Sequence, residues 1–336
     1  MIGQLEPLER KILDHWLILA VNYKKFILGL SGGVDSVCLL FILIKVKKYL
    51  PNFNNIIFGA IHINHGISPN AFLWQDFCTK LCDSLDIKIT SVGHKVVKGG
   101  GESLENNARQ VRYKEYTNFD TEVIILAHHL NDQVETVLSQ IFRGSELHNI
   151  AGMKIVNNKL GKIYFRPLIT TLKSELIEYA KKNKLNYVND ESNLDNKYLR
   201  NFIRNELIPK GLAFDNNLLF KLTKFSNDIQ NILEVLDELS EEDFNNTSTD
   251  LVGNKSFYIP RVMIVDKFIK LNFGRQKSAI CLYLKKNSLL LPSENQIKEF
   301  LRQVVESNWD KNPSMSLKHG FKLVKIKNYI GLTRGC

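Results

Sequence analysis

Short apolar runs alternate with helical stretches through the first 144 residues of the chain. Four runs are rich in Ile, Leu, Val and Phe and have the length of buried strands, at 26–30, 56–64, 87–94 and 122–129. The stretches around them carry apolar residues at helical spacing, at 8–22, 34–50, 70–86, 103–119 and 131–144. Strands and helices that alternate in this way predict an α/β fold, in which a parallel sheet is flanked by helices. Ligands of such sheets bind beyond the carboxyl ends of the strands.

Residues 213–336 have a different pattern, which predicts a smaller α+β region. Helical spacing covers 216–242 and 294–307, and the second of these helices begins after a serine that can cap it. Residues 320–334 alternate like two short strands around a tight turn. The end of the chain therefore mixes helices and strands without the regular alternation of the first part.

Charge is uneven along the chain, whose net charge is +10. Residues 251–336 hold 16 Lys and Arg against 5 Asp and Glu, whereas residues 1–250 hold 29 against 30. The stretch 233–256 is acidic and then rich in Asn, Thr and Ser, which is typical of a helix end and a linker. We therefore expect one domain at 1–212 and, at 213–336, a helical linker with a basic accessory domain that has a polyanionic partner.

The composition argues against secreted and membrane proteins. Five cysteines in 336 residues are too few, and odd in number, for a disulfide framework. No apolar run reaches the roughly 18–20 residues of a membrane span, and the first residues carry acids instead of an apolar signal core. We expect a cytoplasmic protein with no membrane partner.

The sequence SGGVDS at 31–36 follows the first predicted strand and begins a helix. The two glycines permit a tight turn, so that backbone N–H groups of the loop and of the helix N-terminus point at one spot, where phosphate can bind. The expected nucleotide ligands in this loop are Ser31, Gly32, Gly33, Val34, Asp35 and Ser36. No Walker lysine follows, and Asp35 beside a polyphosphate needs a cation, so a Mg²⁺ ion is expected. A plain glycine turn with a capping serine is the alternative.

Other polar residues follow the second strand and line the helix at 103–119. His62 ends the second strand, where it bounds an adenine or ribose pocket or is merely part of a polar strand end. Arg109 and Arg112 share a helical face with Glu105, and this face begins at the expected phosphate edge. We interpret the arginines as phosphate ligands, with a solvated ion pair as the alternative.

The block AHHLNDQVET at 127–136 combines a histidine with two acids. Asp132 and Glu135 are three residues apart and therefore lie on one face of a helix, close to His128 at the end of the fourth strand. Together with Asp35 they indicate a site for Mg²⁺ or for an ammonium group, although one acid at a helix N-terminus is ordinary capping. Further along, Arg200 and Arg204 share a helical face, with solvated surface arginines as the alternative.

The loop motif resembles the signature of the N-type ATP pyrophosphatases, or PP-loop proteins, which cleave ATP between its α- and β-phosphates. Five further blocks follow in order, at 62–67, 103–113, 127–136, 165–168 and 190–209. With these blocks the chain is similar to the tRNA(Ile)-lysidine synthetases over about its first 210 residues. One departure is Asn131, which stands where that family commonly has the first of two acids; the second acid, Asp132, is present.

The resemblance implies a ligase that uses ATP and Mg²⁺. The wobble cytidine in the CAU anticodon of tRNA(Ile) would be adenylated, and free L-lysine would then displace AMP to form lysidine. The resemblance assigns lysine binding to Asp132 and Glu135, the adenylation step to His128, and substrate or phosphate contacts to Arg200 and Arg204. The expected catalytic residues are Asp35, Arg112, His128, Asp132 and Glu135; the expected metal ligands are Asp35 and Asp132; and His62 and Arg109 are expected at the nucleotide.

Two other functions remain as alternatives. A PP-loop cytidine 2-thiolase needs CxxC pairs for an iron–sulfur cluster, whereas this chain has Cys78 and Cys82 at CxxxC spacing on a helix whose apolar face they line. A non-catalytic RNA-binding protein would be expected to lack Asp35 or Asp132, and both are present. The region at 213–336 is expected to bind tRNA through its positive charge. The oligomeric state stays open, with a homodimer as one alternative.

Overall fold

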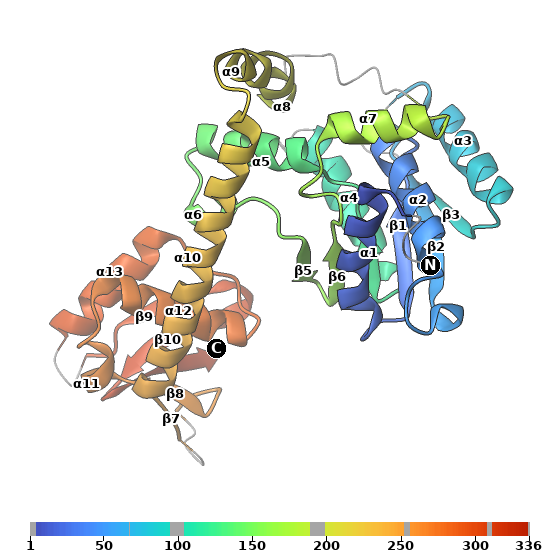
Figure 1. The fold of residues 1–336 in the computed structure, drawn as a ribbon. Helices are drawn as coiled ribbons and strands as arrows, with labels where there is room; N and C mark the ends of the chain where they lie inside the picture. Colours follow the sequence, from blue (N-terminus) through green and yellow to red (C-terminus); the bar gives the residue numbers. More distant parts are fainter. Residues whose placement is uncertain are drawn as a thin grey trace. The chain divides into compact units, whose positions relative to one another are not determined.

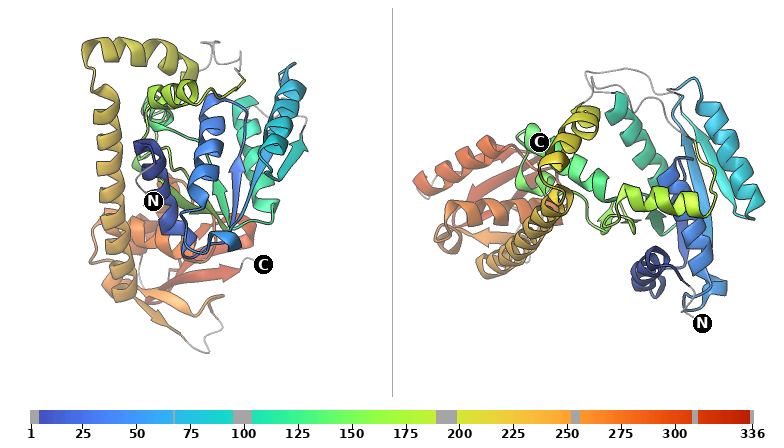
Figure 2. Two further views of the ribbon diagram at one scale, coloured as in Figure 1. Left: turned by 45° about the vertical axis from the view of Figure 1, so that its right-hand side comes forward. Right: turned by 45° about the horizontal axis from the view of Figure 1, so that its top comes forward.

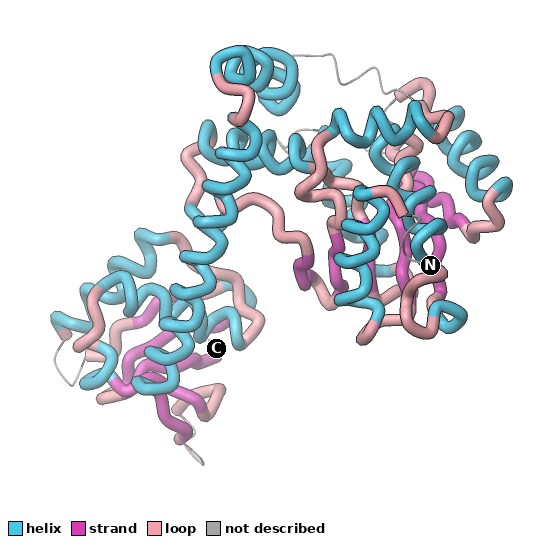
Figure 3. The backbone as a smooth tube through the Cα atoms, viewed as in Figure 1, coloured by secondary structure: helices cyan, strands magenta, loops and turns pink. Residues whose placement is uncertain are grey.

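The computed structural model describes residues 5–66, 68–94, 104–188, 199–251, 256–307 and 311–334. The chain forms two compact units, which divide between Ile229 and Gln230. Each unit has its own sheet and its own buried core (Figures 1 and 3). None of the described helices is long and apolar enough to cross a lipid bilayer.

Unit 1 is built on a six-stranded sheet in the order β3-β2-β1-β4-β6-β5. Its strands are β1 (Lys25–Gly29), β2 (Ile57–Asn64), β3 (Ile89–Gly93), β4 (Val123–Ile125), β5 (Val156–Lys159) and β6 (Lys162–Phe165). Its helices are α1 (Pro7–Ala20), α2 (Val34–Lys47), the short η2 (Phe53–Asn55), α3 (Ala71–Ser84), α4 (Leu104–Asn118), α5 (Leu130–Phe142), α6 (Leu147–Ile150), α7 (Lys173–Lys182), α8 (Leu199–Phe202), η4 (Ile203–Leu207) and α9 (Ile208–Phe214). All strand pairs are parallel except β5 with β6, which confirms the predicted α/β fold with helices on both faces (Figure 2).

Strand β1 occupies the middle of this sheet because both of its faces are apolar. Its Phe26 and Leu28 side chains join the core formed with α1, α2 and α7, whereas Ile27 packs against Tyr116 of α4 on the opposite face. The period of two residues sends successive side chains to opposite faces, so a continuous apolar run suits a strand covered on both sides. The carboxyl end of β1 is thereby fixed, and the SGGVDS loop follows directly from it.

Unit 2 contains a five-stranded antiparallel sheet in the order β7-β8-β11-β10-β9. Its strands are β7 (Ser248–Asp250), β8 (Arg261–Ile264), β9 (Ser314–Ser316), β10 (Phe321–Ile326) and β11 (Tyr329–Arg334), and its helices are α11 (Val265–Phe268), α12 (Phe273–Lys286), α13 (Glu294–Glu306) and the short η5 (Lys318–Gly320). Helix α10 (Leu218–Thr247) runs through the boundary between the units. The two predicted strands near the end of the chain are β10 and β11, and Ser293 caps α13 as predicted.

Three elements differ from the sequence predictions. The fourth strand covers only Val123–Ile125, because His129 leaves the sheet to cap the N-terminus of α5. The β5–β6 hairpin was not predicted from its short polar sequence. Helix α10 continues to Thr247 through the expected linker, since Phe244 packs into the core of unit 2. Tertiary packing there outweighs the weak helix propensity of Asn and Thr.

Candidate active site

The SGGVDS loop is held by hydrogen bonds between its own serines. The Ser31 backbone N–H donates to Ser36 Oγ at 3.2 Å, and Ser36 Oγ donates to the Gly33 carbonyl at 3.0 Å. Gly32 has φ +88°, in the left-handed region, and its carbonyl accepts a hydrogen bond from the Val188 N–H at 3.0 Å. The loop therefore turns sharply between β1 and α2, and α2 presents its N-terminus at the carboxyl edge of the sheet.

His62 supports this loop from behind. Its side chain is buried, and Nδ1 donates to the carbonyl of Leu30, the residue before the loop, at 2.9 Å. Burial lowers the pKa of the His62 imidazole, so the ring is neutral at physiological pH. The observed contact is with the protein backbone, and a contact between His62 and the nucleotide stays a prediction.

The two loop glycines are expected to respond differently to alanine. A Cβ on Gly32 would lie 2.9 Å from Val188 Cγ2, and the left-handed φ of this residue is unfavourable for any side chain. Gly32→Ala should therefore lower the free energy of unfolding by roughly 1–3 kcal/mol. Among the described residues, a Cβ on Gly33 would meet only Ser31 Oγ, at 3.6 Å. Gly33→Ala should therefore fold normally but weaken ATP binding by crowding the phosphates. Thermal unfolding and ATP titration of both variants test this contrast. Equal stability of the two variants would contradict the strain assigned to Gly32.

Asp35 lies in the first turn of α2 and points toward the start of α5. Its Oδ2 is 3.3 Å from Lys173 Nζ and 3.5 Å from His129 Nε2, whereas its buried Oδ1 has no hydrogen-bond partner among the described residues. Burial alone would raise the pKa of Asp35, but the His129 ring and the Lys173 ammonium hold this pKa below its ordinary value. Asp35 is therefore a carboxylate with one unused oxygen beside the glycine loop.

His129 connects the loop to α5 and was not singled out by the sequence analysis. The ring Nδ1 accepts the Asp132 N–H at 3.3 Å, and Asp132 Oδ2 accepts the His129 N–H at 3.1 Å, which forms a capping box. Since Nδ1 accepts, the ring proton lies on Nε2, which is 3.5 Å from both Asp35 Oδ2 and Asp132 Oδ2. His129 thus fixes the separation of the two carboxylates.

Asp132 and Glu135 are paired with Arg200 and Arg204. Arg200 donates to Glu135 Oε2 at 2.8 Å and to Asp132 Oδ1 at 2.9 Å. Arg204 donates to both Glu135 oxygens, at 2.6 and 2.7 Å. The Glu135 side chain is only 2% exposed, so these charge-assisted bonds replace its hydration. The structure thereby brings together the four residues that the sequence predicted for substrate binding.

A π-helical turn and an apolar cluster hold the arginines in this position. Arg200 lies in α8 and Arg204 in the π turn η4, and π turns occur frequently at functional sites. Ile203 packs with Leu130 and Val134 of α5, which presses the arginine-bearing segment onto the acid-bearing helix. The preceding residues 189–198, part of a block cited in the sequence analysis, lie outside the described residues.

Lys173 completes the cluster and was also missed by the sequence analysis. Its Nζ approaches Asp35, and its backbone N–H donates to Asn131 Oδ1 at 3.0 Å. Asn131, the departure from the family pattern, therefore ties α5 to α7. A lysine at the first position of a helix opposes the helix dipole, and this was the available signal for a functional role.

His128 and Arg112 lie at the same edge of the sheet. Burial lowers the pKa of the His128 imidazole to about 3, and the charges of Arg166 and Arg200 act in the same direction. Arg112 Nη2 is 3.5 Å from Nε2 of His65, whose pKa is lowered to about 4, chiefly by burial. His128 is therefore neutral at physiological pH and can act on phosphate through a hydrogen bond, not through a charge.

The neutral state of His128 has a measurable consequence. Because the folded-state pKa lies below the unfolded value near 6.5, the unfolded chain binds more protons, so His128 makes folding less favourable as pH falls from about 6.5 toward 3. The His128 resonance is identified as the one that disappears in the variant His128→Gln. In an NMR titration of the wild-type protein, this resonance should show no protonation step above about pH 5. A step near pH 6.5 would contradict a His128 that its surroundings keep neutral.

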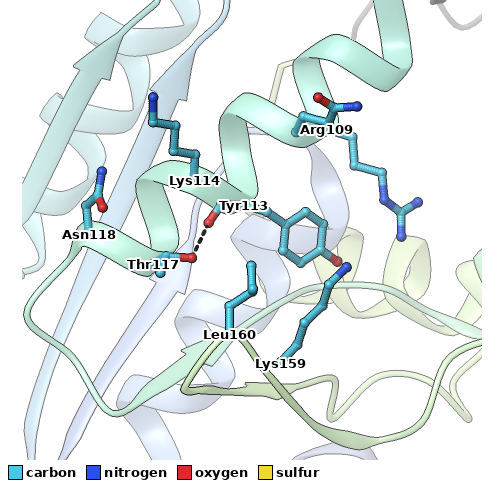
Figure 4. A pocket seen from close by; sticks show the side chains of 8 residues that line it. Arg109, Tyr113, Lys114, Thr117, Asn118, Lys159 and Leu160 are labelled. Carbon is cyan, nitrogen blue, oxygen red and sulfur yellow. Dashed lines mark hydrogen bonds between the residues drawn. The ribbon is translucent and has the colours of Figure 1, made fainter. Parts of the chain in front are cut away.

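Arg109 is placed apart from this cluster. Its guanidinium lies over the ring of Tyr113, with Cζ 5.6 Å from the ring centroid, and it lines a pocket on the side of α4 (Figure 4). These contacts connect Arg109 to the pocket and not to the glycine loop. Its expected contact with the nucleotide stays a prediction.

Asp35 offers a Mg²⁺ ion the most available donor atom of the described cluster, and a contact between Asp132 and the metal stays a prediction. Asp35 Oδ1 is a buried carboxylate oxygen without a partner among the described residues, which suits a Mg²⁺ ion that takes its other ligands from phosphates and water. Both Asp132 oxygens are already used, by the His129 N–H and by Arg200. The described residues hold no group of three or more His, Cys, Asp or Glu side chains arranged for a metal.

The cysteines of α3 are part of the core. Cys78 and Cys82 are fully buried free thiols, and burial raises their pKa values to about 12 and about 11. A metal or cluster ligand is a thiolate, and these two cysteines are held as neutral thiols among apolar neighbours. This environment argues against the thiolase alternative.

Comparisons of the sequence relate this chain to known proteins. Residues 6–211 match the PP-loop domain family. A tRNA(Ile)-lysidine synthase from Histophilus somni (strain 2336) is 33% identical over 298 residues, which span 88% of this chain and 67% of that protein. Another from Chromobacterium violaceum is 32% identical over 313 residues, or 92% of this chain and 68% of that protein.

One solved structure shares the fold at low sequence identity. The U34-tRNA thiolase NcsA from Methanococcus maripaludis, solved with its iron–sulfur cluster, aligns with a TM-score of 0.56 over 66% of this chain and 77% of that one. Its identity of 17% shows a common fold alone. The domain match and the identity to relatives over most of the chain confirm the resemblance noted in the sequence: the chain belongs to the tRNA(Ile)-lysidine synthase family of PP-loop proteins.

Proposed function

We propose that this protein is an ATP-dependent ligase that joins lysine to the wobble cytidine in the CAU anticodon of tRNA(Ile). In the first step the 2-oxo oxygen of the cytosine attacks the α-phosphate of ATP, and pyrophosphate leaves. In the second step the ε-amine of lysine attacks the activated ring carbon and loses a proton. AMP then leaves with the former 2-oxo oxygen, and the product is lysidine.

One connected cluster supports this proposal most strongly. Asp35 follows the glycine loop, His129 lies between Asp35 and Asp132, and Glu135 lies one helical turn after Asp132. A phosphate-binding loop therefore adjoins two carboxylates that suit an ammonium group. A ligase that passes through an adenylate needs these two sites together, because the amine must reach the atom that the phosphate has activated.

One group of site residues is assigned to the phosphates of ATP, and another to the ammonium group of lysine. The glycine loop and the α2 N-terminus receive the phosphates, and Asp35 Oδ1 would hold a Mg²⁺ ion, which when bound supplies positive charge next to them. Arg112 and neutral His128 stabilise charge that develops at the α-phosphate. Asp132 and Glu135 receive the ammonium group of lysine.

The pairing of these acids has a consequence for the order of binding. Three carboxylates, of Asp35, Asp132 and Glu135, are balanced by three cations, of Lys173, Arg200 and Arg204. An added ammonium group gains little electrostatic attraction from a cluster whose charges already cancel. When the triphosphate of ATP attracts Arg200 and Arg204, Asp132 and Glu135 become available to lysine, so ATP should strengthen lysine binding.

Both units carry a net positive charge. The acidic stretch before residue 251 belongs to unit 2, so 230–336 hold 16 basic and 12 acidic residues, a net charge of +4, whereas 1–229 hold 29 and 23, a net charge of +6. Within unit 2, Arg261 pairs with Asp250, Arg275 with Asp243 and Lys286 with Glu241. A basic tRNA-binding role for 213–336 stays a prediction, and unit 1 also supplies positive charge.

The first step can be tested without lysine. Pyrophosphate release from ATP should require a tRNA whose anticodon carries the wobble cytidine. A matched tRNA with adenosine at that position lacks the attacking oxygen and should give only background release. Equal release with both tRNAs would show that the wobble base is not the nucleophile.

A further inference from the structure

A pocket lies on the flank of unit 1, between α4 and the β5–β6 hairpin (Figure 4). Its volume is about 510 Å³, within the range of roughly 300–1,000 Å³ that is usual for ligand pockets. Its lining residues are Arg109, Gln110, Tyr113, Lys114, Thr117, Asn118, Lys159 and Leu160. Three of these side chains are cationic and none is acidic, so the pocket favours an anionic ligand.

Tyr113 holds two of the three cations in place. Lys159 Nζ is 4.9 Å from the centroid of the Tyr113 ring, and Arg109 Cζ is 5.6 Å from it. Figure 4 shows both side chains directed to the ring from different elements. Contacts of this kind restrict long flexible side chains before a ligand arrives, which lowers the entropic cost of binding.

The ring itself is fixed from the protein side. Tyr113 packs against Tyr164 of β6 at 5.1 Å and against Tyr116 at 6.3 Å between ring centroids. The charge of the buried Arg166 also acts on Tyr113, where with the neighbouring cations it outweighs burial and lowers the pKa of the phenol. The two cations are exposed to solvent on one side and rest on an anchored aromatic ring on the other.

Part of the pocket is apolar. Leu160 lines it at the tip of the β5–β6 hairpin, where its side chain is 63% exposed and its φ is +54°. An exposed leucine in the left-handed region is unfavourable in both respects. Apolar surface beside three cations fits a ligand that combines phosphate with a sugar or base, which is the chemistry of a nucleotide.

The position of the pocket favours RNA over free ATP. Strand β6 runs parallel to β4, so the hairpin tip before Lys162 lies toward the amino ends of the parallel strands. The glycine loop follows the carboxyl end of β1, at the opposite edge. A ligand that occupies the reaction centre and this pocket together must be long, and it must carry phosphates along its length.

We propose that this pocket binds a backbone nucleotide of the RNA substrate, with phosphate at Arg109, Lys114 and Lys159 and the sugar or base against Leu160 and Tyr113. The inference rests on the proposed function, because that function makes RNA the substrate. It adds a contact on unit 1 that is separate from the reaction centre and from the basic residues of unit 2.

Charge reversal tests the pocket. Lys159→Glu and Lys114→Glu should each weaken equilibrium binding of tRNA roughly tenfold, and each should make the dependence of log affinity on log salt less steep by about one. The affinity for ATP should not change. The matched control is Lys80→Glu on α3, the helix before β3, and β3 lies at the end of the sheet opposite β5. This variant changes the net charge equally and should have little effect on tRNA binding.

The outcomes distinguish this inference from the proposed function. Unchanged tRNA binding in both pocket variants, with wild-type protein still forming lysidine, would overturn the pocket inference alone. A weaker affinity for ATP with unchanged tRNA binding would identify a free-nucleotide site and would also overturn it. Absence of lysidine with the wild-type protein would instead contradict the proposed function.

Discussion

Replacement of Asp35 by alanine should abolish pyrophosphate release from ATP and tRNA. Asp35 is the first acid after the glycine loop, and its Oδ1 is the buried carboxylate oxygen that the described residues leave without a partner. Without this carboxylate, the Mg²⁺ ion that neutralises the phosphates would lose its protein ligand. We expect a loss of roughly a hundred- to a thousandfold in rate, the scale on which single electrostatic contacts to a transition state act. The measurement is pyrophosphate release at saturating ATP, Mg²⁺ and tRNA.

Two further variants make this result specific. Asp35→Asn keeps the shape of the side chain but not its charge, and it should be nearly as inactive. Asp76→Ala removes an exposed acid of α3 that pairs with Lys80, and it should retain full activity. Release at the wild-type rate by Asp35→Asn would refute a metal-binding role for this carboxylate.

Glu135→Gln should separate the two half-reactions. If Glu135 holds the lysine ammonium, the variant should still release pyrophosphate and accumulate adenylated tRNA. Its lysine requirement should rise tenfold or more, because a hydrogen bond to a charged group contributes roughly 1.5–3 kcal/mol. A titration of lysine, following both pyrophosphate and modified nucleoside, gives the result.

The structure provides a competing explanation for Glu135. Its carboxylate accepts hydrogen bonds from Arg200 and Arg204, so the change to glutamine can also displace these two arginines. If the acid only positions the arginines for the phosphates, pyrophosphate release will fall together with lysidine formation, and Arg204→Gln will reproduce the defect. Glu206→Gln is the control, since Glu206 lies on the same π-helical turn as Arg204 but pairs with Lys210.

Features that depend on local pattern could be predicted from the sequence. The apolar run at 26–30 predicted the central strand, because alternating side chains of β1 serve two cores. The spacing of Asp132 and Glu135 predicted a shared helix face, and both now contact Arg200. Spacing alone could not show that the acids are already paired, because their partners come from a segment about 65 residues further along the chain.

Features that depend on distant segments were missed. His129 was not predicted, although its neighbour His128 was. A histidine that caps a helix and separates two carboxylates cannot be recognised from the sequence alone. The charge counted after residue 250 is a property of the sequence alone, and acids before that residue pair with it in the folded unit, as Asp243 does with Arg275. Net charge predicts a partner only after the folded unit is known.

Nucleoside analysis of tRNA is the most direct test of the account. A tRNA(Ile) with a CAU anticodon would be incubated with the protein, ATP, Mg²⁺ and lysine, then digested and separated with mass detection. We expect lysidine to replace the wobble cytidine, and AMP and pyrophosphate to form in equal amounts with it. A thiolated cytidine, or an unmodified wobble cytidine after complete incubation, would contradict it.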